Sequence, residues 1–462
     1  LSEVPPILRK DYPEGFFSGL PFYFDDLRPQ GFLGRVQTRR VANTLGVSQD
    51  SREWLPEHTL SYLLHYGDDL PGDLIIGEEM AARVRRGELG ADPSSLTVSV
   101  PAGLQNERYP ELSELIIRGE SFGSSAGGEQ PKFATWVIDE GNLPRAVLVK
   151  FSPVMTTQAG RRWADLLLAE SHALDVLREV GVAAAPAKIL EAGTRRFLEV
   201  TRYDRVGARG RRGMVSLLSL DAGVIEGKND TWVDSANAME TAGLLTTEDA
   251  RLLRRLWCFG VLIGNNDMHR GNISFWWREE PPFALAPVYD MLPMGFGPNS
   301  QGELVTRELS FPEMTETLRA DWEVAARWAL DFWARVLADG RFSPDFAVLA
   351  LAMRQLVVEF VSGPPAVETP APAFATRYPN VAQALEEQKK KSDSSLRGPE
   401  GNQAKVKQEL AAILAANEDL WRVAKALFPE GPKPVEFAAF SLDAYHYLGV
   451  GDEVRAFMGK LW

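Results

Sequence analysis

The sequence is poor in cysteine and has no long hydrophobic run. Its 462 residues include a single cysteine, Cys258, which excludes an internal disulfide and most structural zinc sites. No apolar stretch approaches the ~20 residues that a membrane-spanning helix needs. The first residues, which include Pro5 and Pro6, do not have the pattern of a signal peptide either. We therefore expect a protein of the reducing cytoplasm without membrane attachment, in which Cys258 is an inert buried thiol.

Positive charge is also scarce relative to negative charge. The 50 lysines and arginines against 63 aspartates and glutamates give a formal net charge of −13, which argues against broad electrostatic binding of nucleic acid. The run 209–212 is a basic exception, and we interpret it as a solvated loop rather than a site for RNA or an acidic partner. The sequence begins with Leu1 rather than methionine, so we expect an N-terminal segment to precede it.

A polar loop between two apolar segments stands out, at residues 264–272 (GNNDMHRGN). The segment before it, 246–263, has the apolar spacing of a helix, and residues 273–276 resemble a buried strand. Asp267 and Asn272 have the D-x-x-x-x-N spacing of a kinase catalytic loop. There the aspartate accepts the proton of the attacking hydroxyl and the asparagine binds magnesium. Because both residue types are common in turns, the spacing alone leaves an ordinary polar turn as an equal alternative.

A second polar segment, residues 119–133, is rich in glycine and serine and leads into a strand pattern at 133–138. Glycines allow backbone amides to approach phosphate oxygens closely. The segment lacks the Gly-Lys-Ser/Thr end of a Walker loop. Taken alone, it fits a hairpin or a linker better than a phosphate site.

A lysine and a glutamate follow this segment. Lys150 ends an apolar strand pattern, as does the kinase lysine that contacts the α- and β-phosphates. Glu170 lies on the apolar face of the next helical pattern, at 163–180. An unpaired buried carboxylate is unfavourable by several kcal/mol, so we expect a cationic partner for Glu170. Lys150 is the leading candidate, and Arg161 and Arg162 are the alternatives.

Two further features have counterparts in kinases. The strand pattern 196–202 contains Glu199 and Thr201 and stands where a kinase strand leads into the hinge that frames adenine. Asp290 ends a strand-like run after the polar loop, where the D-F-G motif of a kinase supplies a second magnesium-binding carboxylate. Hard oxygen ligands of this kind suit magnesium held mainly by nucleotide phosphates. His269 could be a base, but we favour a structural role within the loop.

The order of these features resembles that of the HipA family of serine/threonine kinase toxins. The resemblance rests on residues 124–132 (SSAGGEQPK), 264–272 (GNNDMHRGN) and 289–293 (YDMLP), and it covers about residues 20–360. The sequence is most similar to the branch called YjjJ, or to a HipT-like relative. The resemblance implies an α+β, two-lobed protein-kinase-like (HipA-like) fold with a small N-terminal subdomain and a helical C-terminal lobe. The domains we expect are a HipA N-terminal-like subdomain (1–105), an N-lobe with the Gly/Ser loop (106–203), a helical C-lobe with the catalytic loop (204–362), a linker (363–402) and a C-terminal helical segment of unknown role (403–462).

The same resemblance implies ATP, Mg²⁺ and transfer of the γ-phosphoryl group to a serine of a translation component, typically an aminoacyl-tRNA synthetase. Asp267 matches the base, Lys150 the phosphate-binding lysine, and Asn272 and Asp290 the magnesium ligands. Ser125 matches the loop serine that the family autophosphorylates, where about two negative charges would exclude nucleotide phosphates. The nucleotide-binding residues that we expect are Ser124, Ser125, Ala126, Gly127, Gly128, Lys150, Glu199 and Thr201.

The family also implies a cognate, DNA-binding antitoxin, separate or fused, and the N-terminal segment that we expect to be missing could carry its helix-turn-helix. We expect no direct binding of nucleic acid by this chain. Two other functions fit less well. One is a catalytically degenerate nucleotide-binding regulator, against which the presence of Lys150, Asp267, Asn272 and Asp290 argues. The other is a DNA-acting, nuclease-like toxin, for which the basic run at 209–212 is the only support.

Overall fold

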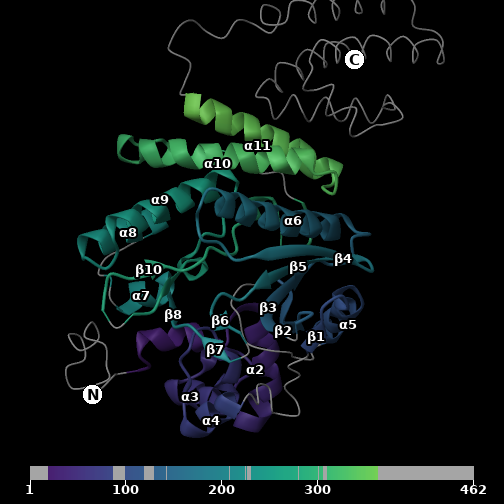
Figure 1. The fold of residues 1–462 in the computed structure, drawn as a ribbon, viewed down its shortest axis with the longest axis vertical. Coiled ribbons are helices and arrows are strands. Elements are labelled where there is room, and N and C mark those ends of the chain that lie inside the picture. Colours follow the sequence, from purple (N-terminus) through teal and green to yellow (C-terminus); the bar gives the residue numbers. More distant parts are fainter. Residues whose placement is uncertain are drawn as a thin grey trace, which may run out of the picture. The chain divides into compact units, whose positions relative to one another are not determined.

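The computed structural model divides into two compact units, 1–343 and 344–462, which we describe separately (Figure 1). The residues that the structure describes are 19–86, 99–118, 130–141, 143–207, 209–223, 225, 230–278, 280–299, 301–304 and 310–362. The Gly/Ser loop at 119–129 lies outside them, as do the predicted linker and the C-terminal helical segment.

The first unit begins with short helices packed around aromatic residues. Trp54, Tyr62 and Leu63 are buried at their centre. Gly46 follows the last residue of α2, and its φ of 62° is the left-handed conformation that favours glycine. Residues 19–86 contain only helices and connecting segments. The elements are η1 (Phe22–Leu27), α2 (Gly31–Leu45), η2 (Ser51–Glu53), α3 (Pro56–Tyr66), η3 (Gly67–Asp69) and α4 (Glu78–Arg86).

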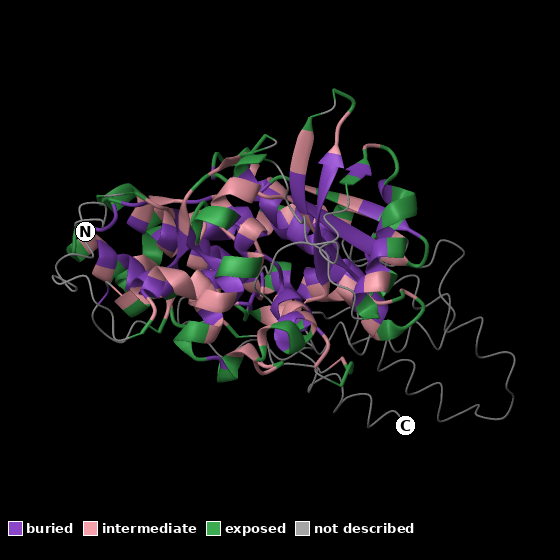
Figure 2. Cartoon of the chain, turned by 90° about the horizontal axis from the view of Figure 1, so that it is seen from below, coloured by how far each residue is buried: buried purple, intermediate pink, exposed green. Residues whose placement is uncertain are grey.

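A five-stranded sheet follows, in the order β1-β2-β3-β5-β4. The β1–β2 pair is parallel and the other pairs are antiparallel. Because side chains alternate along a strand, each face of the sheet has its own core. Figure 2 shows that most of the length of the strands is buried. One face packs on α5 through Tyr109, and the other packs on α6 through Leu167. The elements are β1 (Ser99–Pro101), α5 (Gln105–Ile117), β2 (Lys132–Ile138), β3 (Pro144–Phe151), α6 (Gln158–Glu179), β4 (Ala187–Ala192) and β5 (Arg195–Thr201).

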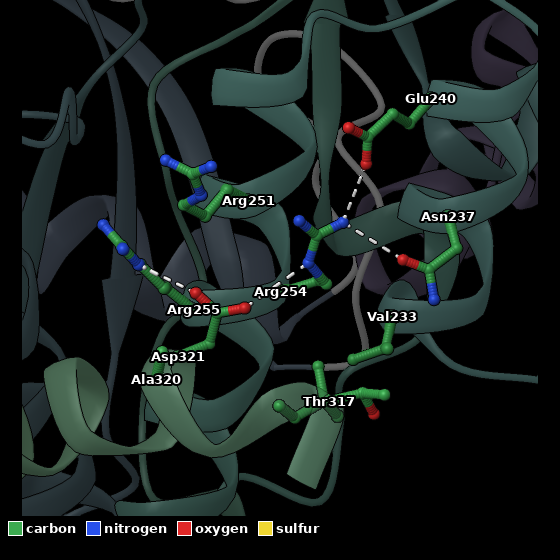
Figure 3. A pocket seen from close by; sticks show the side chains of 10 residues that line it. Val233, Asn237, Glu240, Arg251, Arg254, Arg255, Thr317, Ala320 and Asp321 are labelled. Carbon is green, nitrogen blue, oxygen red and sulfur yellow. Dashed lines mark hydrogen bonds and ion pairs between the residues drawn. The ribbon is translucent and has the colours of Figure 1, made fainter.

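The rest of the first unit is mainly helical. α9 and α10 pack together through aromatic residues, and the Trp333 indole donates a hydrogen bond of 3.2 Å to the carbonyl of Leu262. A polar pocket lies among α8, α9 and the start of α10 (Figure 3). The elements are β6 (Arg205–Val206), β7 (Gly210–Arg211), β8 (Met214–Ser216), α7 (Leu217–Gly223), α8 (Trp232–Thr241), α9 (Thr247–Leu262), η4 (Arg270–Asn272), β9 (Ser274–Trp276), β10 (Ala284–Leu285), η5 (Met294–Phe296), η6 (Glu316–Leu318) and α10 (Arg319–Ala338).

In the second unit, the structure describes one helix, α11 (Pro344–Ser362). No helix of the described residues is long and apolar enough to cross a membrane. The prediction of an α+β fold is confirmed, with the kinase-like succession of a lysine-bearing strand, a packed helix, a sheet and a helical lobe. The strand predicted before Asp290 is wrong, because Val288 forms only an isolated bridge with Ala184.

Candidate active site

A buried lysine lies at the centre of the candidate site. Lys150 is at the end of β3, and its side chain is 3% exposed. Its Nζ donates to both carboxylate oxygens of Glu170 on α6, at 2.7 and 2.8 Å, and it also pairs with Asp290. The structure therefore contains the ion pair that the sequence suggested for Glu170. The alternative partner Arg162 instead donates to the carbonyl of Phe296, at 3.0 Å.

The opposite charges at this site stabilise the ionised forms of Lys150 and Asp290. Burial alone would lower the pKa of Lys150, but the carboxylates of Asp290 and Glu170 raise it above its ordinary value. Burial opposes ionisation of Asp290 as well, and the ammonium groups of Lys150 and Lys132 nevertheless lower its pKa. Lys150 is therefore a fixed positive charge beside an ionised Asp290, which is the arrangement that phosphate and cation binding require.

The polar loop after α9 brings Asp267 and Asn272 together. The Nδ2 of Asn272 donates to the backbone carbonyl of Asp267 at 2.7 Å, and the Asp267 N–H donates to Oδ1 of Asn265 at 3.0 Å. His269 accepts a hydrogen bond from the Gly271 N–H at 3.0 Å through Nδ1. The loop is thus closed by its own side chains. Among the described residues, neither the Oδ1 of Asn272 nor the Asp267 carboxylate has a hydrogen-bond partner.

Burial raises the pKa of Asp267, and the nearby Asp290 carboxylate adds to that shift while His269 opposes it. A raised pKa makes a carboxylate a better proton acceptor. As a whole residue Asp267 is exposed, at the edge of the site rather than inside it. This position gives a hydroxyl group from another molecule a route to the carboxylate.

Asp290 has a strained backbone. Its φ is 52°, and among the described residues it is the one non-glycine residue with a positive φ. Such conformations persist where surrounding contacts hold them, and they occur often at functional sites. Here the preceding Tyr289 supplies the contacts, because its hydroxyl bonds Ser274 at 2.8 Å and the carbonyl of Gly271 at 2.8 Å. Tyr289 therefore fixes Asp290 relative to the loop that carries Asp267.

Glycines allow the close packing around the polar loop. A Cβ at Gly260 of α9 would lie 2.2 Å from Sδ of Met268, so the glycine makes room for this loop residue. A Cβ at Gly295 would lie 2.7 Å from the carbonyl oxygen of Gly264, to which the Gly295 N–H donates at 2.9 Å. The segment after Asp290 is thereby joined to the start of the loop.

Sequence reasoning missed Lys132. It starts β2 opposite Lys150 in the β2–β3 register, so both side chains lie on the α6 face, and it is 1% exposed. Its charge lowers the pKa of Asp290 and acts against the raised pKa of Asp267. A signal for Lys132 was present, because pairing the two strand patterns as a hairpin places it beside Lys150.

The structure does not bring two of the predicted nucleotide-binding side chains to this face. Glu199 lies opposite Val149 in the register, on the α5 face, where it accepts hydrogen bonds from Tyr109 at 2.5 Å and Arg145 at 2.7 Å. Arg145 also donates to Thr201 at 3.1 Å. A nucleotide role for this strand end would have to use backbone atoms. The predicted loop residues Ser124, Ser125, Ala126, Gly127 and Gly128 lie outside the described residues.

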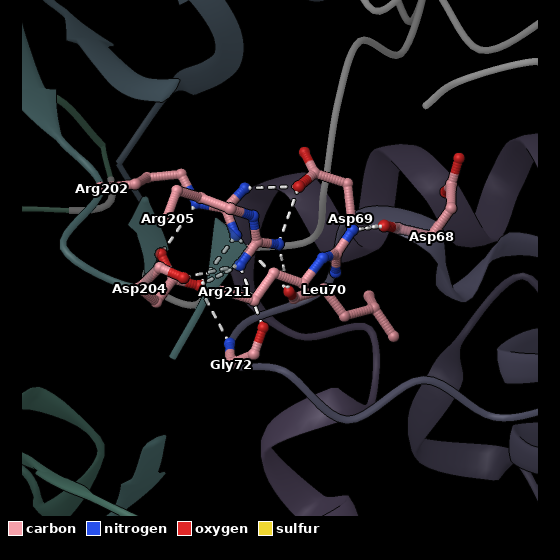
Figure 4. A network of polar contacts seen from close by, with 8 residues as sticks. All are labelled: Asp68, Asp69, Leu70, Gly72, Arg202, Asp204, Arg205 and Arg211. Atoms are coloured by element: carbon pink, nitrogen blue, oxygen red, sulfur yellow. Dashed lines mark hydrogen bonds and ion pairs between the residues drawn. The ribbon is translucent and has the colours of Figure 1, made fainter. Parts of the chain in front are cut away.

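A buried ionic network joins the hinge after β5 to the N-terminal helices (Figure 4). Oδ1 of Asp69 accepts from Arg202 at 2.9 Å and from Arg205 at 2.8 Å. Asp204 accepts from Arg205 at 2.7 Å and from the Gly72 N–H at 2.9 Å. Burial opposes ionisation of Asp69, yet the two arginines lower its pKa below the ordinary value. The N-terminal helices are thus joined to the hinge by paired charges.

The run 209–212 belongs partly to this network, which corrects its interpretation as a solvated loop. Arg211 lies on β7 and donates to the carbonyl of Asp68, and burial lowers its pKa to about 10. Arg212 lies over the ring of Trp276, with 5.3 Å between the guanidinium carbon and the ring centroid. The sequence could not show this, because the contacts of Arg211 come from a segment more than a hundred positions earlier.

Two family models and one curated protein match long parts of the chain. A family model for a HipA-like C-terminal domain matches residues 124–340, and one for the middle domain of a YjjJ-like toxin matches residues 3–85. Toxin YjjJ of Escherichia coli strain K12 is 37% identical over 348 residues, which are 75% of this chain and 76% of that protein. The chain belongs to the HipA-like toxin family, in its YjjJ-like branch.

Two solved structures are more distantly similar to this HipA-like toxin. HipA of Shewanella oneidensis MR-1, in a complex with HipB and operator DNA, has 16% identity and a TM-score of 0.38, over 74% of this chain and 83% of that one. The proinflammatory kinase CtkA of Helicobacter pylori has 13% identity and a TM-score of 0.30, over 51% of this chain and 89% of that one. The family assignment rests on the sequence matches. These matches place the chain among kinase-like toxins of the toxin–antitoxin type.

Proposed function

We propose that this HipA-like toxin is an ATP- and Mg²⁺-dependent serine/threonine protein kinase. The observation that carries the proposal is the buried Lys150, held between Glu170 and Asp290 on the face that Asp267 also approaches. Glu170 fixes the lysine on one side, so that its ammonium group can neutralise the phosphate oxygens of a nucleotide. A toxin of this kind would act on a translation component, and an aminoacyl-tRNA synthetase is the substrate class that we propose.

The residues of the polar loop fit the proton and positioning steps of phosphoryl transfer. Asp267, with its raised pKa, is the proposed acceptor of the proton from the attacking hydroxyl. Asn272 holds the loop closed through Nδ2, and its Oδ1 accepts no hydrogen bond from the part of the chain that the structure describes. We assign His269 the structural role of closing the loop, because its Nδ1 is already bonded to the Gly271 N–H.

The donor set fits magnesium. Asn272 supplies an amide oxygen and Asp290 a carboxylate whose pKa is lowered, which are the hard ligands that Mg²⁺ prefers. No group of three or more His, Cys, Asp or Glu side chains suited to a metal occurs in the described part of the chain. The proposed cation would therefore depend on nucleotide phosphates for its remaining ligands. Its chemistry there would be to neutralise phosphate charge.

Two regulatory features complete the proposal. We propose that Ser125 is autophosphorylated, because a charged group at this loop would repel nucleotide phosphates from the site. We also propose that the chain works with a cognate antitoxin, the partner that its resemblance to the HipA family implies. For the domains, we propose the boundaries that the sequence predicts, which are 1–105, 106–203, 204–362, 363–402 and 403–462.

Mass spectrometry can test the proposed activity. The full chain would first be treated with a phosphatase, which is then removed, and incubated with ATP and Mg²⁺. We expect one added phosphate on a peptide that contains Ser125, and none in Asp290→Ala or after addition of EDTA. The matched control is Glu140→Ala, which should behave like the wild type. Glu140 is exposed in the β2–β3 turn, at the opposite end of these strands from Lys150. Equal phosphorylation of wild type and Asp290→Ala would contradict the proposal.

A further inference from the structure

The polar pocket among α8, α9 and α10 lies outside the candidate active site (Figure 3). Its volume is about 610 Å³. Three arginines of α9 line it, at positions 251, 254 and 255, and this spacing places them on one side of the helix. Two acidic residues, Glu240 and Asp321, also line it, so the lining has an excess of one positive charge. That excess contrasts with the chain's net charge of −13.

Two of the three arginines have side-chain N–H donors without a partner among the described residues. Among the described residues, the side chain of Arg251 has neither a hydrogen bond nor an ion pair (Figure 3). Arg255 uses its Nε, which donates to Asp321 at 3.0 Å, and its terminal nitrogens have no partner in the described part of the chain. A guanidinium group has five N–H donors in a fixed fork that matches a carboxylate. The pocket can therefore accept an anionic group from outside.

Arg254 gives the pocket a rigid wall. It donates to Asn237 at 3.1 Å and Glu240 at 3.1 Å on α8, and to Asp321 at 3.4 Å on α10. These bonds tie three helices together and hold Asp321 in the position that orients Arg255. The site is thus formed before any ligand arrives, which reduces the entropy lost on binding.

We propose that this pocket binds an acidic peptide segment of the protein substrate. The proposal rests on the kinase function and names a docking feature of its substrate. Apolar side chains at Val233, Leu318 and Ala320 line the same pocket, so it offers contacts to aliphatic atoms as well as to carboxylates. A peptide has both kinds of group. A free inorganic anion would use only the arginines.

The pocket and the loop with Asp267 are linked by the same helix, α9. Arg251 and Arg255 precede the last residue of α9, Leu262, by about 10–17 Å along the helix axis, at ~1.5 Å per residue. The loop with Asp267 begins directly after this helix. An extended peptide covers ~3.3 Å per residue, so about three to five residues would span this distance between the acidic segment and the serine that is phosphorylated.

A binding experiment tests the pocket independently of catalysis. The probe is a fluorescein-labelled peptide with five consecutive acidic residues, followed by fluorescence anisotropy with the full chain. The comparison peptide has Gln and Asn at the same positions. We expect binding of the acidic peptide that weakens as salt rises. Arg251→Ala with Arg255→Ala should weaken it by at least about tenfold, while Arg327→Ala, an exposed arginine of α10 outside the pocket, should not.

Several results would overturn the proposal. They are no binding of the acidic peptide by the wild type, equal binding of the neutral peptide, and unchanged binding in the double variant. Preferential binding of a single-stranded oligonucleotide that the double variant loses would assign the pocket to nucleic acid instead. If the double variant does not fold, Arg251→Ala alone is the test. It removes a side chain without a hydrogen bond among the described residues, so it should not disturb the fold. Because the assay measures binding and not phosphoryl transfer, it tests the pocket even if the chain has no kinase activity.

Discussion

Replacement of Asp69 by asparagine should destabilise the chain strongly. Asp69 is buried, and its Oδ1 accepts from Arg202 at 2.9 Å and Arg205 at 2.8 Å. The asparagine keeps the shape of the side chain but removes its charge. Arg202 and Arg205 would then keep the carboxylate of Asp204 as their shared partner. Removal of one partner from a buried ion pair destabilises a protein by about 3–5 kcal/mol, and we expect a loss in this range.

Urea denaturation followed by tryptophan fluorescence measures this loss. Asp50→Asn is the matched control, because Asp50 pairs with Arg52 at the surface, and it should leave the unfolding midpoint nearly unchanged. A loss below about 1 kcal/mol for Asp69→Asn would refute the argument that this network stabilises the junction of the N-terminal helices and the hinge.

The effect should also depend on pH. The pKa of Asp69 is lowered in the folded protein by Arg202 and Arg205 against the effect of burial. A carboxyl with a lowered folded pKa contributes stability that is fully present above its unfolded pKa of ~3.9 and is lost as the pH falls toward the folded value. The difference between wild type and Asp69→Asn should therefore be constant near neutrality and shrink below about pH 4. An equal difference at pH 3 and pH 7 would contradict this account.

Three further predictions concern the candidate site and the helix before it. Glu170→Gln should lower the rate of autophosphorylation by on the order of 10²-fold, because Lys150 loses the carboxylate that fixes its position; an unchanged rate in a phosphate-incorporation assay would show that Asp290 alone suffices. Gly260→Ala should destabilise the chain by about 1–3 kcal/mol in urea denaturation, since the new Cβ would meet Sδ of Met268, and Met268→Ala in the same chain should recover part of the loss. Burial raises the pKa of Cys258 to about 12, so the native protein should not react with a thiol reagent at pH 8 and should react once when unfolded in urea; rapid native labelling would show that the thiol is accessible.

Local sequence patterns predicted the elements that carry the site. Apolar spacing located α6 and α9 to within a few residues, because each has one continuous buried face. The unfavourable burial of a carboxylate predicted a partner for Glu170, and the structure supplies Lys150. The arguments that succeeded thus concern one element or a pair of consecutive elements.

The features that were missed depend on contacts between distant segments. The network of Arg202, Arg205 and Arg211 needs Asp68 and Asp69 from the N-terminal helices, and no local pattern signals that pairing. The pocket on α9 needs α8 and α10 for its walls. The face on which a strand residue points was also missed, since the side chain of Glu199 lies with α5 rather than with Lys150.

The most direct test of the kinase account compares nucleotide binding with phosphoryl transfer in Asp267→Ala. Isothermal titration calorimetry would measure ATP affinity in the presence of Mg²⁺, and phosphate incorporation would measure transfer in the same preparations. The account predicts nearly unchanged ATP affinity and a loss of transfer of at least ~10²-fold, because the proposed proton acceptor is removed while Lys150, Asn272 and Asp290 remain. Transfer at the wild-type rate in Asp267→Ala would contradict the account.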